Sequence, residues 1–379
     1  MGWSVQGQHK AKKEEKSVSP EIVYNRLRAH SFNPLKQDNS MTIDKILDKA
    51  GIAELDDQDW KVRLLAVRDL IKAGKKSTEE IIIGLSDSSM HIRQVCAMAL
   101  GILKAKEAIG KLEQLLKTDE NTMVRSQAAI ALGQMEAEQS VALLKEVLES
   151  DPSRDVMHQC ELAIDQIKKH KGTSDKMLEA FLSIDESTFE TVIFNSLAPD
   201  FKLEDTDGNE WELVKFRNKQ WVVLIWVFAD WCPVCHSEFH DLMNMQKQFK
   251  DAGIQVFTLE IHDMYRGRVM VGKELEPTYW FAKESFKEAY TNKIWWPHLL
   301  DRGGIQAAKF GADPLAFSVH AEYINRPTTA IIDKNGILRF LYQGTFWGDR
   351  PSIEQTLEMI ENEEFNFEHQ DRLKIKQQN

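Results

Sequence analysis

The sequence predicts a multidomain protein in which an all-α array of helical repeats is followed by an α/β domain. Four amphipathic segments recur in the first half of the chain at intervals of 30 to 32 residues, and such intervals are typical of stacked helix pairs. An unbroken apolar run at 221–229 indicates a buried central strand in the second half. Two cysteines and a segment suited to a helix come directly after that run. These observations divide the chain into a repeat half and a sheet half.

The composition indicates a globular protein with room for two or three cores. The chain has 379 residues, of which 42% are hydrophobic, and a single core rarely grows beyond about 250–300 residues. The net charge of −11 argues against nucleic acid as a partner. No apolar stretch reaches the roughly 18 residues of a membrane span, so we expect no membrane partner either. Four cysteines without an apolar leader segment favour a reducing compartment, and we expect a cytoplasmic protein.

The helical array is predicted over 41–172, after a polar segment at 1–40 that we expect to be a flexible tail. Each repeat opens with acidic or serine-rich turn residues and continues as an amphipathic helix. The pattern D-x-x-x-x-V-R-x-x-A-A-x-A-L-G at 119–133 resembles HEAT-like repeats, in particular the short kind of phycobilisome lyases. This resemblance implies a scaffold whose concave face holds a protein partner. One aliphatic position marks the register of the repeats and is occupied by Val62, Ile92, Val124 and Val156.

The repeat register also assigns structural roles to two cysteines and three arginines. Cys96 and Cys160 fall at the position that Ala66 and Ala128 fill in the other repeats. We therefore expect both thiols to be buried in the core and to have no redox role. The arginine that follows the register residue could bind an anion, but pairing with an acidic turn residue of a neighbouring repeat fits the array better. These arginines are Arg63, Arg93 and Arg125.

The sequence Trp231-Cys232-Pro233-Val234-Cys235 places two thiols where the apolar strand ends. Pro233 suits the first turn of the helix that follows, because the N–H that it lacks would be unpaired there. A helix N-terminus favours an anion, so a thiol at this place loses its proton more readily. A thiolate can attack a disulfide, and a second thiol nearby can then release the partner. The spacing therefore indicates a redox dithiol.

Two other kinds of site share this pattern. With His236 it also matches the CxxCH motif of c-type haem attachment, but that chemistry needs an export segment. A CxxC can be half of a zinc site, yet the chain has no second CxxC. We expect His236 and His240 to be exposed helix positions. We expect neither a metal nor another cofactor.

The α/β domain is predicted over 194–365, after a linker at 173–193 that contains a short helix and before a polar C-terminal tail at 366–379. Its motifs resemble the thioredoxin-like superfamily, and within it the redoxins of the alkyl hydroperoxide reductase/thiol-specific antioxidant type. The chain therefore resembles HEAT-like helical repeats followed by an α/β thioredoxin fold. The matching motifs are APDF at 198–201, WCPVC at 231–235, RPTT at 326–329 and IDKNG at 332–336.

The resemblance implies roles for the residues of these motifs. Cys232 would be the nucleophile and Cys235 the resolving thiol of a redox-active disulfide. Pro327 would be a cis-proline that lies against the dithiol and exposes backbone for substrate pairing. Trp231 and Pro233 would support the site.

The chain departs from the thioredoxin pattern at two places. Trp226 stands where thioredoxin has a buried strand aspartate, so proton transfer at Cys235 must use another group or water. Arg326 precedes the expected cis-proline, and a guanidinium near Cys232 would favour its thiolate. We therefore expect replacement of Arg326 with alanine to raise the pKa of the Cys232 thiol.

We predict a thiol-disulfide oxidoreductase that acts on the thiols or disulfides of a client protein, with the helical array recruiting that client. A peroxiredoxin-like thiol peroxidase with antioxidant activity is the first alternative. Against it, Ala229 lacks the hydroxyl that peroxiredoxins place three residues before their reactive cysteine. A non-enzymatic scaffold or redox-sensing interaction protein is the alternative of another class.

Overall fold

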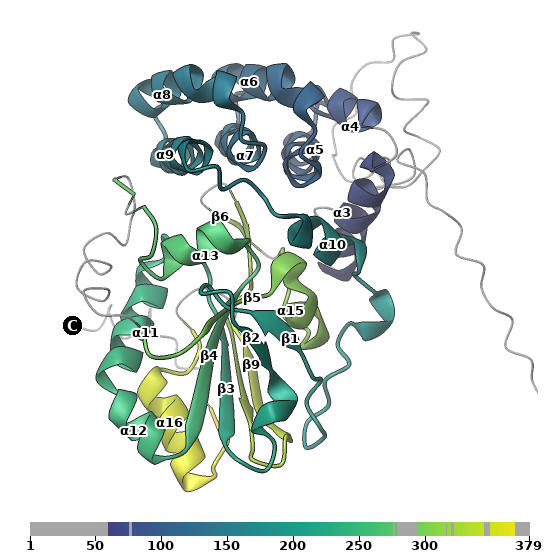
Figure 1. Ribbon diagram of the computed structural model, residues 1–379. Helices are drawn as coiled ribbons and strands as arrows, with labels where there is room; N and C mark the ends of the chain where they lie inside the picture. The colour runs from purple at the N-terminus through teal and green to yellow at the C-terminus, as the bar shows by residue number, and fades with distance from the viewer. Residues whose placement is uncertain are drawn as a thin grey trace, which may run out of the picture.

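The computed structural model describes most of the chain between residues 60 and 367, so the first part of the predicted array, 41–59, lies outside the described residues. The predicted tail at 1–40 lies outside the described residues, and so does the segment 368–379 of the predicted polar C-terminal tail. The described residues are 60–75, 78–275, 277–278, 294–315, 317–319, 322–344 and 349–367. They form an all-α array followed by an α/β domain with a mixed sheet (Figure 1). The predicted fold class is confirmed.

The array has two layers of helices. Helices α5, α7 and α9 face the α/β domain, and α4, α6 and α8 lie on the side away from it (Figure 1). Packing contacts run mainly between neighbours in the series, as expected of stacked repeats. The helices are α3 (Trp60–Gly74), α4 (Glu79–Gly84), α5 (Met90–Leu103), α6 (Ile109–Thr118), α7 (Thr122–Gln134), α8 (Val141–Ser150) and α9 (Arg154–Lys168).

The repeat register predicted the burial of the array cysteines correctly. Cys96 and Cys160 are completely buried, as is Ala128 at the equivalent place in α7. Burial raises the pKa of both thiols, so they stay protonated and unreactive near neutral pH. Their role as core residues is confirmed.

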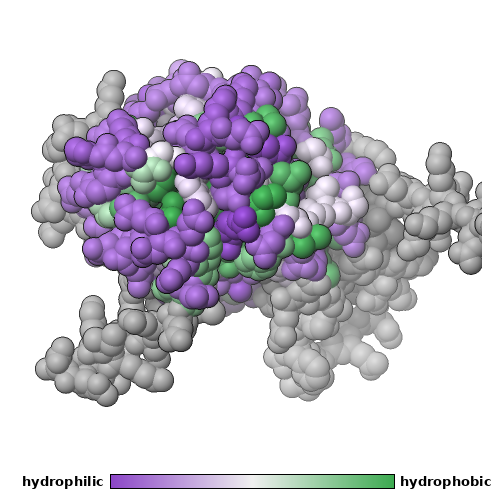
Figure 2. Space-filling view, turned by 90° about the horizontal axis from the view of Figure 1, so that it is seen from below, coloured by the Kyte–Doolittle hydropathy of each residue, from purple (hydrophilic) through white to green (hydrophobic). Residues whose placement is uncertain are grey.

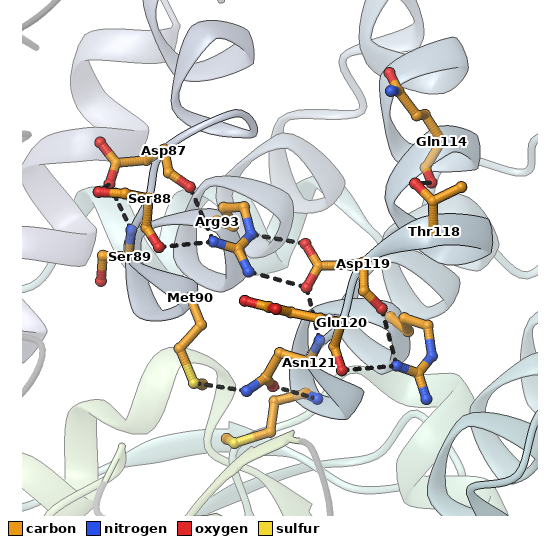
Figure 3. Close-up of polar contacts among 12 residues, drawn as sticks. Asp87, Ser88, Ser89, Met90, Arg93, Gln114, Thr118, Asp119, Glu120 and Asn121 are labelled. Carbon is orange, nitrogen blue, oxygen red and sulfur yellow. Dashed lines mark hydrogen bonds and ion pairs between the residues drawn. The ribbon is translucent and has the colours of Figure 1, made fainter.

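A ladder of arginine–aspartate pairs joins successive repeats, as the register predicted. Arg93 donates from Nε and Nη2 to the two carboxylate oxygens of Asp119, at 2.7 and 2.9 Å (Figure 3). Arg125 repeats this geometry on Asp151, at 2.7 and 3.1 Å. The remaining Nη1 of Arg125 donates to the carbonyl oxygen of Asp119 at 2.9 Å. Both guanidinium groups are therefore fully engaged by the array, and the side chain of Arg63 lies outside the described residues.

The α/β domain is built on a five-stranded sheet with the order β5-β4-β3-β8-β9. Strand β3 pairs in parallel with β4 and antiparallel with β8, and it lies at the centre of the sheet. All six of its side chains are buried, because helices or loops cover both faces of the sheet. The strands are β3 (Trp221–Trp226), β4 (Ile254–Glu260), β5 (His298–Leu300), β8 (Thr328–Ile332) and β9 (Leu338–Gln343).

The two faces of the sheet have separate cores. Val223 and Ile225 belong to the core beneath α11 (Pro233–Asn244) and α16 (Ile353–Asn362). Leu224 and Trp226 point to the opposite face and share a core with Phe310. Three further helices lie in the described part of this domain: α12 (Gln246–Asp251), α13 (Met264–Met270) and α15 (Ile305–Lys309). Two short hairpins pair β1 (Lys202–Glu204) with β2 (Glu210–Glu212) and β6 (Phe317–Val319) with β7 (Glu322–Ile324). Single 3-10 turns lie at Lys106–Ala108, Glu138–Ser140, Glu186–Thr188, Leu213–Phe216 and Arg302–Gly304.

The α/β domain packs directly against the array. Helix α10 (Asp175–Leu182), in the segment between the two, buries Met177 and Phe181 in the array core. Helix α13 lies below the inner layer of the array (Figure 1), where the Tyr265 hydroxyl donates to Asp165 of α9 at 2.9 Å. A cavity of about 80 Å³ remains between α7, α9 and α13. The inner face of the array is thus occupied by the domain of the same chain.

The face of the molecule that lies away from the helical array is mostly hydrophilic. Figure 2 views it from below, and its apolar side chains lie in small separate patches among polar ones. In the part of the chain that the structure describes, none of the helices combines the length and the apolar character needed to cross a membrane.

Candidate active site

The two predicted active-site cysteines lie where β3 ends and α11 begins. Cys232 is the N-cap residue of α11, with φ −80° and ψ 114°, and Pro233 occupies the first turn. The Cys232 Sγ atom accepts a long hydrogen bond of 3.5 Å from the amide of Cys235. Proline fits this place because the first helical turn has no partner for its N–H. Both sulfur-bearing side chains have no solvent exposure, so the dithiol is closed in this conformation.

A buried ion pair lies against Cys235. Nη2 of Arg350 is 3.8 Å from the Cys235 Sγ atom, and Nη1 donates to the carbonyl oxygen of Trp226 at 2.5 Å. The same guanidinium binds both carboxylate oxygens of Glu238, with Nε at 2.7 Å from Oε1. Glu238 lies one helical turn after Cys235, and Arg350 precedes α16. The ion pair therefore places the positive charge of Arg350 beside the Cys235 sulfur. Glu238 comes from α11, and Arg350 comes from the segment before α16.

The environment separates the pKa values of the two thiols. Burial raises the pKa of Cys235, but a hydrogen bond from Cys232, the charge of Arg350 and the N–H of Phe228 together outweigh it and lower that pKa. Burial and the hydrogen bond to Cys235 raise the pKa of Cys232 well above its usual range. The reduced pair therefore ionises first at Cys235, with the Cys232 thiol as donor to its thiolate.

The expectation that a thiol at the start of the helix loses its proton more readily does not hold for Cys232. The one backbone N–H that lies near its sulfur does not offset complete burial. Arg350 instead acts on the second cysteine. No motif in the sequence identifies Arg350, because 115 residues separate it from Cys235. The one hint was Trp226, which stands where thioredoxin has a buried strand aspartate. Its presence meant that any charged group near Cys235 had to come from another part of the chain.

Trp226 does not take over the role of that aspartate. Its indole lies in the core on the other face of the sheet and donates from Nε1 to Asp301 at 3.3 Å. Burial raises the pKa of Asp301 to about 6. Because this carboxyl is on the face away from α11, the charged groups that reach Cys235 are Arg350 and Glu238.

Trp231 connects the dithiol to a second group of buried charges. Its Nε1 donates to Oε1 of Glu322 at 2.5 Å, and its ring packs edge-on against Phe228 at 5.4 Å between centroids. Arg266 donates from Nη2 to both Asp230 and Glu322, at 2.8 and 3.1 Å. Although burial favours the neutral acid, Arg266 and His158 hold the pKa of Asp230 well below its usual range. Asp230, directly before Trp231, is therefore a buried carboxylate that Arg266 holds in position.

The expected cis-proline is a trans residue in the structure. None of the peptide bonds in the described residues is cis, so the expectation for Pro327 is wrong. Pro327 directly precedes β8, whose Thr328 pairs with Trp226, and its carbonyl oxygen accepts a hydrogen bond of 2.7 Å from Gly344. A trans proline fits the entry to a strand, where its fixed φ suits extended backbone and a missing N–H can be tolerated. Pro327 still lies at the end of the sheet where β3 ends and the dithiol follows.

Arg326 is half-buried on the segment that leads into β8. Its amide donates to the carbonyl oxygen of Asp313 at 2.8 Å. The cation that lowers the pKa of Cys235 is Arg350, which the sequence did not point to. The effect of Arg326 on Cys232 stays a prediction.

His236 is completely buried, which corrects the expectation of an exposed helix position. Its Nε2 atom lies 2.5 Å from the carbonyl oxygen of Asp230, and burial lowers its pKa to about 4. The ring is therefore neutral at pH 7 and engaged within the domain, which does not fit the axial ligand of an attached haem. Within the described ranges, no cluster of three or more His, Cys, Asp or Glu side chains could hold a metal ion.

Comparison with known proteins identifies both parts of the chain. Residues 194–341 match the AhpC/TSA family, and residues 50–126 and 85–165 match HEAT repeats. The chain thus carries HEAT repeats followed by a thioredoxin-like redoxin domain of the AhpC/TSA type.

Curated relatives of two kinds match the second part. Thiol-disulfide oxidoreductase ResA of Geobacillus thermodenitrificans is 27% identical over 169 residues, which span 45% of this chain and 79% of the relative. The chloroplastic peroxiredoxin Q of Suaeda salsa is 26% identical over 167 residues, which span 44% of this chain and 67% of the relative. A reduced 2-Cys peroxiredoxin from Plasmodium vivax aligns with a TM-score of 0.36 and 20% identity, over 44% of this chain and 80% of that structure. The sequence relatives support a redox function that is either oxidoreductase or peroxidase.

Proposed function

We propose that this protein is a thiol-disulfide oxidoreductase in which Cys232 and Cys235 alternate between a dithiol and a disulfide. The observation that carries the proposal is the pair itself, with one thiol hydrogen-bonded to the other beside a buried arginine. Two thiols that share a proton in this way can each become the nucleophile in turn. The similarity to ResA supports disulfide exchange as the reaction.

The proposed reaction begins with transfer of the shared proton. When the Cys232 proton moves to Cys235, the Cys232 thiolate attacks one sulfur of a client disulfide. The bond between the client sulfurs breaks, and the leaving sulfur takes up a proton from solvent. Cys235 then loses its proton to solvent, because Arg350 stabilises its thiolate. Attack of Cys235 on the Cys232 sulfur forms the protein disulfide and breaks the bond between Cys232 and the client. The second client sulfur leaves as a thiolate that takes up a proton from solvent, so the client gains two electrons and the dithiol loses two. The reverse sequence oxidises a client dithiol.

Trapping tests this proposal. A Cys235→Ser variant cannot resolve the intermediate, so mixed disulfides through Cys232 should accumulate and be detectable by mass spectrometry after incubation with a disulfide-bonded peptide. A Cys232→Ser, Cys235→Ser double variant is the control and should trap nothing, although Cys96 and Cys160 remain. In the unaltered protein, titration with mixtures of oxidised and reduced dithiothreitol should give a reversible Cys232–Cys235 disulfide. Failure to form that disulfide would rule the proposal out.

Recruitment of a client by the helical array is part of the proposal, with a restriction on where the client binds. Since α13 occupies the inner face beside α9, a client would have to use the layer formed by α4, α6 and α8 or the rim of the array. We also propose a cytoplasmic location, which rests on the low number of cysteines.

A thiol peroxidase is the second candidate, and the complete burial of both sulfurs favours it. A hydroperoxide is small enough to enter a closed site that a folded client protein cannot reach without a conformational change. In this reaction a thiolate attacks the peroxide oxygen, which gives a sulfenic acid and releases water or an alcohol. The second thiol then displaces water and forms the disulfide. Ala229 counts against this candidate because it offers no hydroxyl to the peroxide.

Peroxide consumption with dithiothreitol as reductant, compared between the unaltered protein and the double cysteine variant, tests the peroxidase directly. The third candidate, a redox-sensing interaction protein, predicts a reversible disulfide without turnover of either substrate. The three candidates therefore differ in two measurements, which are disulfide reversibility and steady-state turnover.

A further inference from the structure

We infer that helix α9 of the array is a positioning element for the active-site loop, and that it acts through Arg266 on Asp230, Glu322 and Trp231. The inference goes beyond the proposed reaction, because it concerns what the array does to the dithiol and holds for either redox chemistry. It rests on a continuous series of buried polar contacts that runs from the array to the residue before Cys232.

Arg266 is the centre of this series. Its Nη1 donates to the amide oxygen of Gln159 in α9 at 3.2 Å, and its Nη2 donates to Asp230 at 2.8 Å and to Glu322 at 3.1 Å. Glu322 in turn accepts the indole N–H of Trp231 at 2.5 Å. One guanidinium thus joins the array, the loop before the dithiol and the β7 hairpin.

Burial gives these contacts their strength. Asp230, Glu322 and Gln159 are 1–2% exposed, and the side chain of Arg266 is 11% exposed. The charges of Asp230 and Glu322 hold the pKa of Arg266 above its ordinary value although burial opposes them. Hydrogen bonds to a charged group in such surroundings are stronger than neutral ones, and a missing acceptor is not readily replaced by water. Loss of the Gln159 contact should therefore loosen Arg266 and the groups that it holds.

A second contact holds the same helix against the array. Tyr265 precedes Arg266 in α13, and its hydroxyl donates to Asp165 of α9 at 2.9 Å. Leu162 of α9 packs with Tyr265 and Val269 in a small apolar cluster. Helix α13 is therefore fixed to α9 at consecutive residues, so a shift of α9 would be passed on to Arg266.

The consequence concerns access to the sulfur atoms. Trp231 is 4% exposed and directly precedes Cys232, which is completely buried. When Glu322 and Asp230 lose their fixed positions, the Trp231 loop should open more often and expose Cys232 to solvent reagents. In the intact protein the array keeps this loop in place.

The repeat register supplies a matched control. Gln127 occupies the same place in α7 as Gln159 in α9, is 3% exposed and lines the same cavity. Among the hydrogen bonds of the described residues, none joins Gln127 to the α/β domain. Gln127→Ala and Gln159→Ala therefore remove the same group from the same kind of site, and only the second removes a contact to Arg266.

The experiment measures alkylation of each cysteine by iodoacetamide in the reduced full-length protein, with peptides counted by mass spectrometry. For Gln159→Ala we expect Cys232 to react about tenfold faster, the factor for loosening one hydrogen bond to a charged group by about 1.4 kcal/mol. Cys96 should react as slowly as before and serves as the internal reference. Gln159→Glu keeps the acceptor oxygen, so it should restore slow alkylation.

Two results would overturn the inference. The first is an unchanged Cys232 rate in Gln159→Ala. The second is an equal increase in Gln127→Ala, which would mean that loss of packing in the cavity, and not loss of the Arg266 contact, exposes the thiol. Alkylation needs no enzymatic turnover, so failure of the proposed redox function would leave this test valid.

Discussion

The hydrogen bond from Cys232 and the charge of Arg350 together make Cys235 the first thiol of the candidate site to ionise. Its guanidinium lies 3.8 Å from the Cys235 sulfur and is neutralised by Glu238 on its other side. Arg350 lowers the pKa of Cys235 and Glu238 raises it, so the two residues have opposite effects on the same thiol. The balance between them, and not the helix terminus alone, tunes the pair.

Replacement of each residue should therefore shift the first ionisation of the dithiol in a defined direction. We expect Glu238→Gln to lower that pKa, because a nearby negative charge is lost while an acceptor for Arg350 is kept. Adding Arg350→Met to this variant should raise the pKa again, because the cation that stabilises the thiolate is lost. Thiolate absorbance in the ultraviolet as a function of pH measures both values.

Arg339→Met is the control for this series, because Arg339 is 37% exposed and pairs with Asp333 away from the dithiol. It should leave the titration unchanged. A rise of the pKa in Glu238→Gln, or a fall when Arg350→Met is added to that variant, would contradict the assignment. Arg350→Met alone is less informative, since it leaves Glu238 buried without its partner, at a cost of about 3–5 kcal/mol.

These residues also show the limit of prediction from sequence at this scale. The place of Cys232 and Cys235 between a buried strand and a helix could be predicted, because an apolar run and a possible helix start flank them. Arg350 could not, because it reaches Cys235 only through the tertiary fold. The same holds for His236, whose ring is turned into the domain by packing that a helical pattern does not reveal. The cis peptide bond before Pro327 was expected only from the family resemblance, and in this chain that bond is trans.

At the scale of elements, periodic patterns predicted more of the structure. The recurrence of one aliphatic position placed the array helices in register, and the burial of Cys96 and Cys160 followed from it. The apolar run predicted β3 because a strand buried on both faces has no polar alternation. The contacts of α13 with α9 left no such periodic signal, since they join residues about 100 positions apart.

The arginine ladder makes the array sensitive to the shape of one side chain in each repeat. Arg125 donates to both carboxylate oxygens of Asp151 and also to a backbone carbonyl oxygen. A lysine ammonium cannot make these three hydrogen bonds in the same geometry. We expect Arg125→Lys to reduce the free energy of unfolding by about 2 kcal/mol. Urea denaturation followed by circular dichroism measures the loss.

The exposed Arg154 of α9 offers a control of the same chemistry, and Arg154→Lys should change the stability by less than about 0.5 kcal/mol. Equal losses in the two variants would show that the ladder contributes no more than an ordinary surface charge. The ladder ends naturally at the last repeat, where Met157 stands in place of the arginine.

At the scale of the whole molecule, the contact between the array and the α/β domain should couple their unfolding. Glu274 after α13 binds Lys169 and Lys171 of the array as well as Arg268. Although burial opposes ionisation, these three cations lower the pKa of Glu274 to about 2, so it is charged at neutral pH. Together with Tyr265 and Asp165 this group forms a polar border around the apolar contact.

We therefore expect one cooperative unfolding transition for both parts, and two transitions once this border is weakened. Circular dichroism reports mainly on the array helices, while tryptophan fluorescence reports mainly on the α/β domain, because residues 60–182 contain one tryptophan, Trp60. In urea the two signals should coincide for the unaltered protein. In a Tyr265→Phe, Glu274→Gln variant they should separate, since the lost contacts stabilise the interface by about 1 kcal/mol for the hydroxyl and about 1.5–3 kcal/mol for the carboxylate.

Tyr342→Phe removes a hydroxyl whose partner, Asp349, lies within the α/β domain, so its two signals should stay coincident. Coincident signals in the double variant, or separate ones in the unaltered protein, would mean that this interface does not carry the coupling on which control of the dithiol by the array depends.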